Sequence, residues 1–197
     1  MKPRILVFSG SRRAQSFNAR LAKLGAAAVD KAGGQPTLIS LDDYVLPIYD
    51  GDEEQASGIP AAAMALKQLF KTHHGILIAS PEYNASISPL LKNVIDWVSR
   101  ATPTESGKVP YKGKVVALTA ATASAFAGSR ALTHLRQILS GLGAWVVPDQ
   151  PGISGAAQAF AEDGSLKDAG QQALLEALAA SLVAAAGNIG AVTEPQH

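Results

Sequence analysis

The chain has 197 residues, a formal net charge of +1 and no cysteine. Its length suits a single domain over residues 1–197, and 47% hydrophobic residues can build a substantial core. The near-neutral charge gives no electrostatic basis for binding nucleic acid or an anionic membrane, and the lack of cysteine excludes disulfides and thiolate chemistry.

Short apolar runs alternate with longer segments of helical periodicity along the chain. The predicted strands are residues 4–9, 37–41, 75–80, 114–119 and 144–148. The predicted helices are residues 18–32, a segment that opens at 59–60, then 88–100, 129–142 and 165–186, with loops at 42–58 and 102–113 and a frayed tail of about the last ten residues. This alternation predicts a parallel sheet with helices on both faces, but it leaves the strand order open.

Both ends of the chain bear on its location. The apolar run at the start is too short for a signal peptide, and the alanine-rich stretch 173–186 is too short and too interrupted to span a bilayer. We therefore expect a cytoplasmic protein with neither membrane nor nucleic-acid partners.

The segment after the first strand places Ser11, Arg13, Ser16 and Asn18 directly before a helix. Backbone N–H groups at a helix N-terminus bind phosphate, and hydroxyl, amide and guanidinium groups add donors. The alternative is an ordinary helix start with Ser16 or Asn18 as the N-cap. The glycines of a Rossmann loop and of a P-loop are both missing, which favours a monophosphate.

A second polar and aromatic segment follows the third strand and reads Pro81-Glu82-Tyr83-Asn84, then Ser86. Ligands of open α/β sheets bind beyond the carboxyl ends of the strands. A planar aromatic ligand could lie on this loop and be hydrogen-bonded by its backbone. The amphipathic run 90–98 predicts a helix that leads away from the site.

These segments resemble a known family, the NADPH-dependent FMN reductases, which include flavodoxin-like quinone, chromate and azo-dye reductases. The matching runs are Gly10-Ser11-x-Arg13-x-x-Ser16-x-Asn18, Pro81-Glu82-Tyr83-Asn84-x-Ser86 and Leu91-Lys92-Asn93-x-Ile95-Asp96-Trp97. The resemblance covers nearly the whole chain. It implies a flavodoxin-like three-layer α/β sandwich whose five-stranded parallel sheet has the order 2-1-3-4-5, with FMN where the strand order reverses.

By this resemblance the first loop would hold the FMN phosphate and ribityl chain, while the second loop and the loop after the fourth strand would border the isoalloxazine ring. The residues that it places at FMN are Ser11, Arg13, Ser16, Phe17, Asn18, Pro81, Glu82, Tyr83, Asn84, Ser86, Thr122 and Ser124. No catalytic side chain is expected, because hydride passes from NADPH or NADH to the flavin itself. No metal site is expected either.

Two features depart from the family pattern. Ser88 stands where members usually carry proline, and Pro89 follows it. The loop 123–127 after the fourth strand is poor in glycine, and only Gly128 is kept. Both departures lie beside the expected flavin or nicotinamide site, so they bear on substrate preference more than on FMN binding.

Other conspicuous side chains have structural interpretations. Glu82 and Tyr83 are expected to position the cofactor rather than to transfer protons. Trp97 is expected in the core or at a subunit contact, because it shares the apolar face of its helix. Arg130 and Arg136 could reach a phosphate of NADPH or a partner subunit, and the sequence does not choose between these.

The predicted function is an FMN-dependent NAD(P)H oxidoreductase that works by a ping-pong mechanism, with a quinone, azo, flavin or metal-oxyanion acceptor. An FMN electron carrier of the flavodoxin type is the alternative, although such carriers tend to be acidic; a non-enzymatic protein of the same fold is a third. A homodimer or homotetramer is expected, because the alanine-rich helices and the aromatic loop 44–49 offer more apolar surface than one small sheet needs to be covered.

Overall fold

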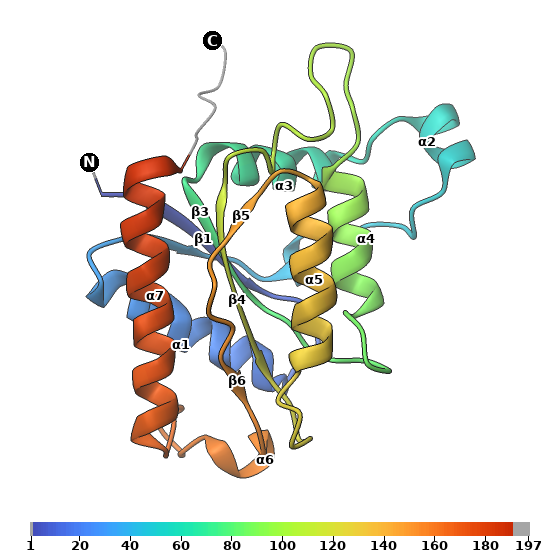
Figure 1. Cartoon of the computed structure of the whole chain (residues 1–197). Helices are drawn as coiled ribbons and strands as arrows, with labels where there is room; N and C mark the ends of the chain where they lie inside the picture. Colours follow the sequence, from blue (N-terminus) through green and yellow to red (C-terminus); the bar gives the residue numbers. More distant parts are fainter. Residues whose placement is uncertain (1, 191–197) are drawn as a thin grey trace.

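The structure is a computed structural model that describes residues 2–190 (Figure 1). Its strands are β1 (Arg4–Ser9), β2 (Gln35–Leu38), β3 (Gly75–Ala79), β4 (Val115–Ala121), β5 (Trp145–Val146) and β6 (Gly152–Ile153). Its helices are α1 (Phe17–Lys31), α2 (Gly51–Ser57), α3 (Ala61–Thr72), α4 (Pro89–Val98), α5 (Ser129–Gly141), α6 (Ala156–Ala159) and α7 (Ala169–Ile189), with a 3₁₀ turn η1 (Leu41–Asp43).

The sheet is parallel and has the order β2-β1-β3-β4-β5, which confirms the predicted flavodoxin-like topology. A short additional strand, β6, also pairs with β4, so that the sheet has a sixth strand beside the five in the predicted order. β5 lies along the start of β4 and β6 along its end. Pro148 and Pro151 lie between β5 and β6. Because proline has no backbone N–H to donate to a neighbouring strand, the segment that runs beside β4 forms two short strands instead of one.

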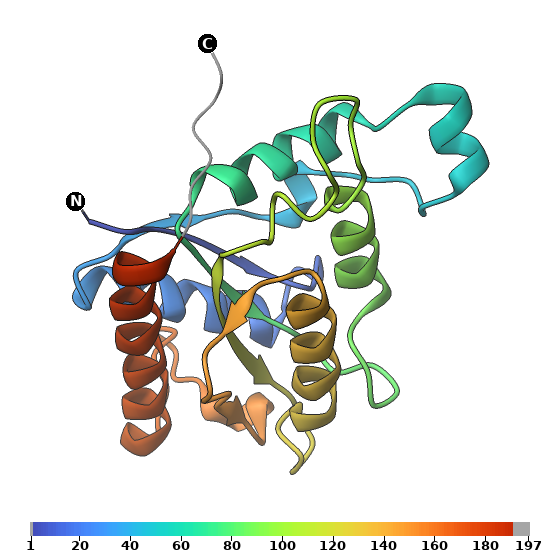
Figure 2. The same ribbon diagram turned by 45° about the horizontal axis from the view of Figure 1, so that its top comes forward.

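Two hydrophobic layers flank the sheet. Helices α1 and α7 cover one face, and α3, α4 and α5 cover the other (Figures 1 and 2). Alternate residues of one strand therefore enter different cores: Ile5 and Val7 pack with α1 and α7, whereas Leu6 and Phe8 pack on the opposite side. This double burial explains the continuously apolar strands.

Two boundaries differ from the prediction at the start of the chain. The second strand runs over Gln35–Leu38 rather than 37–41, because its pairing with β1 begins opposite Arg4 and the Ser40 side chain caps η1 directly afterwards. The predicted loop 42–58 contains α2, whose N-cap Asp50 accepts a hydrogen bond from the Asp52 amide. Acidic residues in its first turn complement the helix dipole and were a readable signal.

The last helix, α7, is displaced from its prediction and runs over Ala169–Ile189 instead of 165–186. It therefore extends into the predicted frayed tail, of which residues 191–197 lie outside the described part of the chain. By length and composition alone its 21 residues could cross a membrane, with a mean hydropathy of 1.4. Its buried residues, including Leu175, Leu178 and Leu182, instead pack against α1 and the sheet.

Candidate FMN site

Three loops meet beyond the carboxyl ends of β1, β3 and β4. They enclose a hollow of about 170 Å³ that is lined by Ser11, Arg13, Ser16, Phe17, Asn18, Pro81, Glu82, Tyr83, Ala121, Thr122 and Ala123. Nine of the twelve residues expected at FMN are in this lining, and Asn84, Ser86 and Ser124 are not. The fold thus brings together segments that lie far apart in the sequence.

The first loop presents open donors at the start of α1. Ser16 is the N-cap, and its hydroxyl accepts from the Ala19 amide at 3.2 Å. Among residues 2–190 no hydrogen-bond partner is found for the backbone amides of Phe17 and Asn18 or for the Arg13 guanidinium. These amides and the guanidinium are therefore available to an anion at this helix terminus.

Asn18 connects the first loop to the end of β4. Its Nδ2 donates to the Ala121 carbonyl oxygen at 2.9 Å, and its Oδ1 accepts from the Ala121 amide at 2.8 Å. The residue is buried, so this pair of bonds fixes the spacing between α1 and the loop after β4. The side-chain amide is occupied by the protein itself, which leaves the Asn18 backbone N–H as its open donor.

The second loop ends in a tight turn with an unusual backbone. Tyr83 and Ser86 exchange two backbone hydrogen bonds, of 2.9 and 3.0 Å, and between them Asn84 and Ala85 have φ angles of 49° and 63°. Two central residues with positive φ define a type I′ turn, in which asparagine is favourable and alanine is strained. The turn leaves Tyr83 43% exposed beside the hollow.

Glu82 attaches this loop to α5. One carboxylate oxygen accepts from Nε of Arg130 at 2.9 Å and also from its Nη2, and the other accepts from the Ala131 amide at 3.2 Å. Burial acts to raise the pKa of Glu82, but the hydrogen bonds from Arg130 and Ala131 outweigh it and lower this pKa overall. A carboxylate held in this way is suited to positioning the loop and not to exchanging protons at neutral pH.

A further contact on the same helix supports the turn, since the Ser86 hydroxyl lies 3.0 Å from Nδ1 of His134. His134 and Arg130 are one helical turn apart, and together they hold both ends of the second loop on α5. Sequence reasoning missed both tethers, because no local pattern relates these partners 48 residues apart.

Ser88, the first departure from the family pattern, has a clear structural role. Its hydroxyl donates to the Gly10 carbonyl oxygen at 2.7 Å and accepts from the Leu91 amide at 3.2 Å as the N-cap of α4. Pro89 then occupies the first helical position, where its missing N–H is harmless. Ser88 thus binds the first loop to the start of α4.

The segment Leu46-Pro-Ile-Tyr-Asp50, part of the aromatic loop, lies against α4 and does not line the hollow. The Pro47 carbonyl oxygen accepts from Nδ2 of Asn93 and from Nε1 of Trp97, each at 2.8 Å, and the Tyr49 ring meets Trp97 edge-on at 5.0 Å. Trp97 is fully buried, which confirms its predicted core position. Arg136 likewise serves the fold, because it donates to the carbonyl oxygens of Val146, Val147 and Pro148.

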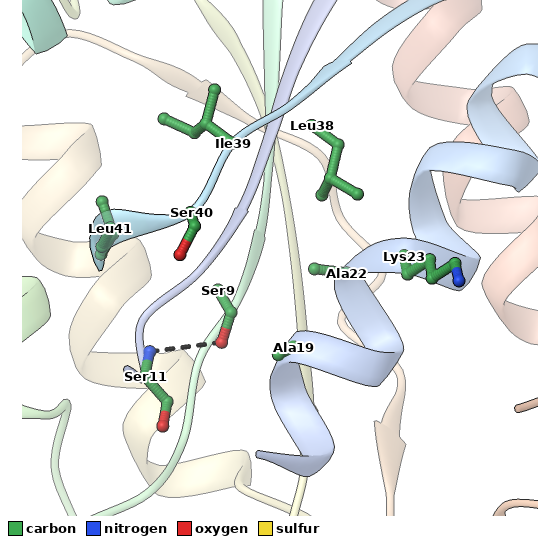
Figure 3. A pocket seen from close by; sticks show the side chains of 9 residues that line it. All are labelled: Ser9, Ser11, Ala19, Ala22, Lys23, Leu38, Ile39, Ser40 and Leu41. Carbon is green, nitrogen blue, oxygen red and sulfur yellow. Dashed lines mark hydrogen bonds between the residues drawn. The ribbon is translucent and has the colours of Figure 1, made fainter. Parts of the chain in front are cut away.

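Two larger hollows flank the first loop, and Ser11 lines both. One, of about 340 Å³, lies between α1 and the end of β2 and includes Ser9, Lys23, Leu38 and Ser40 (Figure 3). There the Ser11 amide donates to the Ser9 hydroxyl at 3.2 Å, and Lys23 points away from both hydroxyls (Figure 3). The other, of about 440 Å³, lies on the α4 side and is lined by Gly10, Ser11, Arg12, Arg13, Tyr83, Ser88, Pro89 and Leu90.

The donor set of the three loops fits FMN. Open amides and Arg13 suit a phosphate at α1, and the backbone amides of Glu82 and Asn84, for which no partner is found within residues 2–190, suit the polar edge of an isoalloxazine ring. Pro81 and Tyr83 provide apolar surface beside that edge. The chemistry present at each end therefore matches the corresponding end of the cofactor.

Comparison with known proteins identifies the family of the chain. Residues 3–158 match the NADPH-dependent FMN reductase family. The chain belongs to that family. It is 34% identical to a quinone reductase of Escherichia coli K12 over 157 residues, 80% of each chain, and 36% identical to an NAD(P)H-dependent FMN reductase of Pseudomonas aeruginosa over 169 residues, 84% of this chain and 85% of that one.

Among solved structures, the flavoenzyme FerB, an NAD(P)H:(acceptor) oxidoreductase of Paracoccus denitrificans, superimposes with a TM-score of 0.78 over 95% of this chain and 99% of its own, at 24% identity. This likeness supports the fold. As a member of the NADPH-dependent FMN reductase family the protein is an FMN-dependent oxidoreductase with NAD(P)H as its co-substrate. The predicted family, enzyme class and cofactor are thereby confirmed.

Proposed function

We propose that this family member oxidises NAD(P)H and reduces a quinone at FMN held between the three loops, and that donor and acceptor use the site in turn. The proposal rests on one observation: a single hollow is lined by the N-terminus of α1 with its open donors, by Pro81–Tyr83 and by Thr122. Relatives named as quinone reductases support the choice of acceptor.

The chain's own groups bind and orient. Bound FMN would supply the redox chemistry, the transfer of two electrons from NAD(P)H to the acceptor. The α1 amides and Arg13 would hold its phosphate, and the Glu82–Arg130 and Ser86–His134 contacts fix the second loop that would border its ring. A quinone that gains these electrons and takes protons from water leaves as the hydroquinone.

Homo-oligomerisation belongs to the same proposal. Val45 and Ile48 are 61% and 78% exposed, although the neighbouring Pro47 and Tyr49 are hydrogen-bonded to Asn93 of α4. Rigid exposed apolar groups of this kind suit contact with a second copy. We propose that each chain is one domain and that the assembly is cytoplasmic.

The test is an absorbance spectrum of the protein with FMN, followed by steady-state oxidation of NADPH and of NADH with 1,4-naphthoquinone. Parallel double-reciprocal lines are expected when both substrates are varied. The proposed function is contradicted if the protein binds no FMN and oxidises neither nucleotide. Intersecting lines would contradict the alternate use of one site by donor and acceptor. Light scattering of the wild-type protein and of Ile48→Asp tests the assembly, which is expected to dissociate in the variant.

A further inference from the structure

We propose that the hollow between the first loop and α4 binds the electron acceptor, and that Arg12 makes it selective for planar aromatic acceptors that carry an anionic group, such as a sulfonate or a carboxylate. This inference rests on the proposed function, because it concerns the acceptor of that reaction. Arg12 is not one of the residues of the first loop that carry the resemblance to the family, so the proposed selectivity concerns this chain.

The position of the hollow suits an acceptor. It shares Ser11, Arg13 and Tyr83 with the FMN hollow, so the two are adjacent. Its volume of about 440 Å³ is within the usual range of small-molecule sites. An acceptor can therefore occupy the border of the FMN hollow at Tyr83 in turn with NAD(P)H and extend the rest of the molecule into this hollow.

The walls of the hollow differ in chemistry. Tyr83, Pro89 and Leu90 form an apolar side, and Pro89 and Tyr83 are exposed at its surface. Arg12 and Arg13 supply its cationic part. An aromatic plane can lie on the apolar side while an anionic substituent meets a guanidinium of the cationic part.

Arg12 retains donors for such an anion. Its Nε donates to Asp42 Oδ1 at 2.7 Å, and for its Nη1 and Nη2 no partner is found in the described chain. The hydrogen bond from Arg12 lowers the pKa of Asp42, so this carboxylate is ionised at neutral pH and competes with a ligand anion for the guanidinium. Planar guanidinium donors favour carboxylate and sulfonate over neutral groups.

The hollow on the other side of Ser11 does not offer this combination. Its cation, Lys23, is directed away from the hydroxyls of Ser9 and Ser11 (Figure 3). Arg12 and Lys23 are both exposed cations near the first loop, but only Arg12 lines the α4 side. Lys23→Gln is therefore a matched control for the loss of one positive charge.

The first experiment compares 1,4-naphthoquinone-2-sulfonate with 1,4-naphthoquinone as acceptors. The ratio of their kcat/KM values is measured in the wild-type protein, Arg12→Gln and Lys23→Gln, all loaded with FMN. We expect Arg12→Gln to lower the ratio about five- to tenfold, as loss of a charge-assisted hydrogen bond predicts, and Lys23→Gln to leave it unchanged. Both acceptors are measured on the same sample, so the ratio does not depend on the FMN content. A wild-type protein that does not reduce 1,4-naphthoquinone contradicts the proposed function and not the selectivity.

The second experiment needs no turnover. Calorimetry measures the Kd of naphthalene-2-sulfonate for the FMN-loaded proteins, including Asp42→Asn. We expect Arg12→Gln to raise this Kd about five- to tenfold and Asp42→Asn to lower it about twofold, because a repelling carboxylate is removed. The inference is overturned if Arg12→Gln changes Kd and the kcat/KM ratio by less than twofold, if Lys23→Gln has the same effect, or if Asp42→Asn weakens binding as Arg12→Gln does.

Discussion

Asn18→Ala is the substitution that should affect both stability and cofactor affinity. It removes the partners of the buried Ala121 N–H and C=O, which Asn18 meets at 2.8 and 2.9 Å. An unsatisfied buried polar group costs about 1–3 kcal/mol, so the loss of partners for two such groups should lower the free energy of unfolding by about 2–6 kcal/mol. Because the same bonds set the spacing of the first and third loops, the Kd for FMN should rise about tenfold, equivalent to about 1.4 kcal/mol.

Urea unfolding of the FMN-free protein, followed by circular dichroism, measures the stability term, because bound FMN would add its own stabilisation. Ser16→Ala is the matched control: it removes the N-cap of the same helix, with an expected cost of about 1 kcal/mol. Flavin fluorescence gives the Kd. An Asn18→Ala cost no larger than that of Ser16→Ala would refute the reasoning, because water would then replace the amide without penalty.

Three further predictions concern the second loop and its neighbours. Ser88→Ala should destabilise the FMN-free protein by about 2 kcal/mol in urea, since the buried Gly10 carbonyl loses its donor and α4 its cap; a loss under about 0.5 kcal/mol would contradict this role. Glu82 has a lowered pKa in the folded protein, so its contribution is present above its ordinary pKa of 4.5 and is lost as the pH falls through the folded value. Wild-type and Glu82→Gln stabilities should therefore differ by about 1 kcal/mol at pH 7 and converge towards pH 3 in unfolding curves; a constant difference would show that the charge is not responsible. Ala85→Gly should raise the thermal midpoint, with a gain of about 0.5 kcal/mol as left-handed strain is relieved, and an unchanged or lower midpoint would argue against that strain.

The arrangement of the sheet was predictable because each strand carries its own signal. Leu6 and Phe8 serve one core while Ile5 and Val7 serve the other, so the apolar run is continuous and easily read. The strand order needed the family motifs, since alternation permits several orders. The split into β5 and β6 depends on how each strand pairs with β4. The two prolines between them are only a weak local signal of this split.

Within the site, sequence reasoning found the loops better than the bonds that arrange them. Ser16 as an N-cap follows from local helix chemistry. The contacts of Asn18 with Ala121 and of Glu82 with Arg130 join residues 103 and 48 positions apart, and each partner alone has an ordinary surface or cap interpretation. Their function in spacing the loops exists only once the fold has brought them together.

The glycine-poor loop after β4 shows how a departure from a family pattern can be accommodated elsewhere. Ala127 adopts a φ of 50°, a conformation that costs an alanine about 1–2 kcal/mol and that glycine would accept freely. The loop fits because β6 approaches it through Gly152, where an added Cβ would lie 2.0 Å from the Ala127 carbonyl oxygen. The close approach of two backbones in this region thus requires a glycine on β6, at position 152, and not in the loop itself. A side chain at position 152 would displace the loop that carries Thr122, and so would alter the ring side of the site without itself lining the FMN hollow.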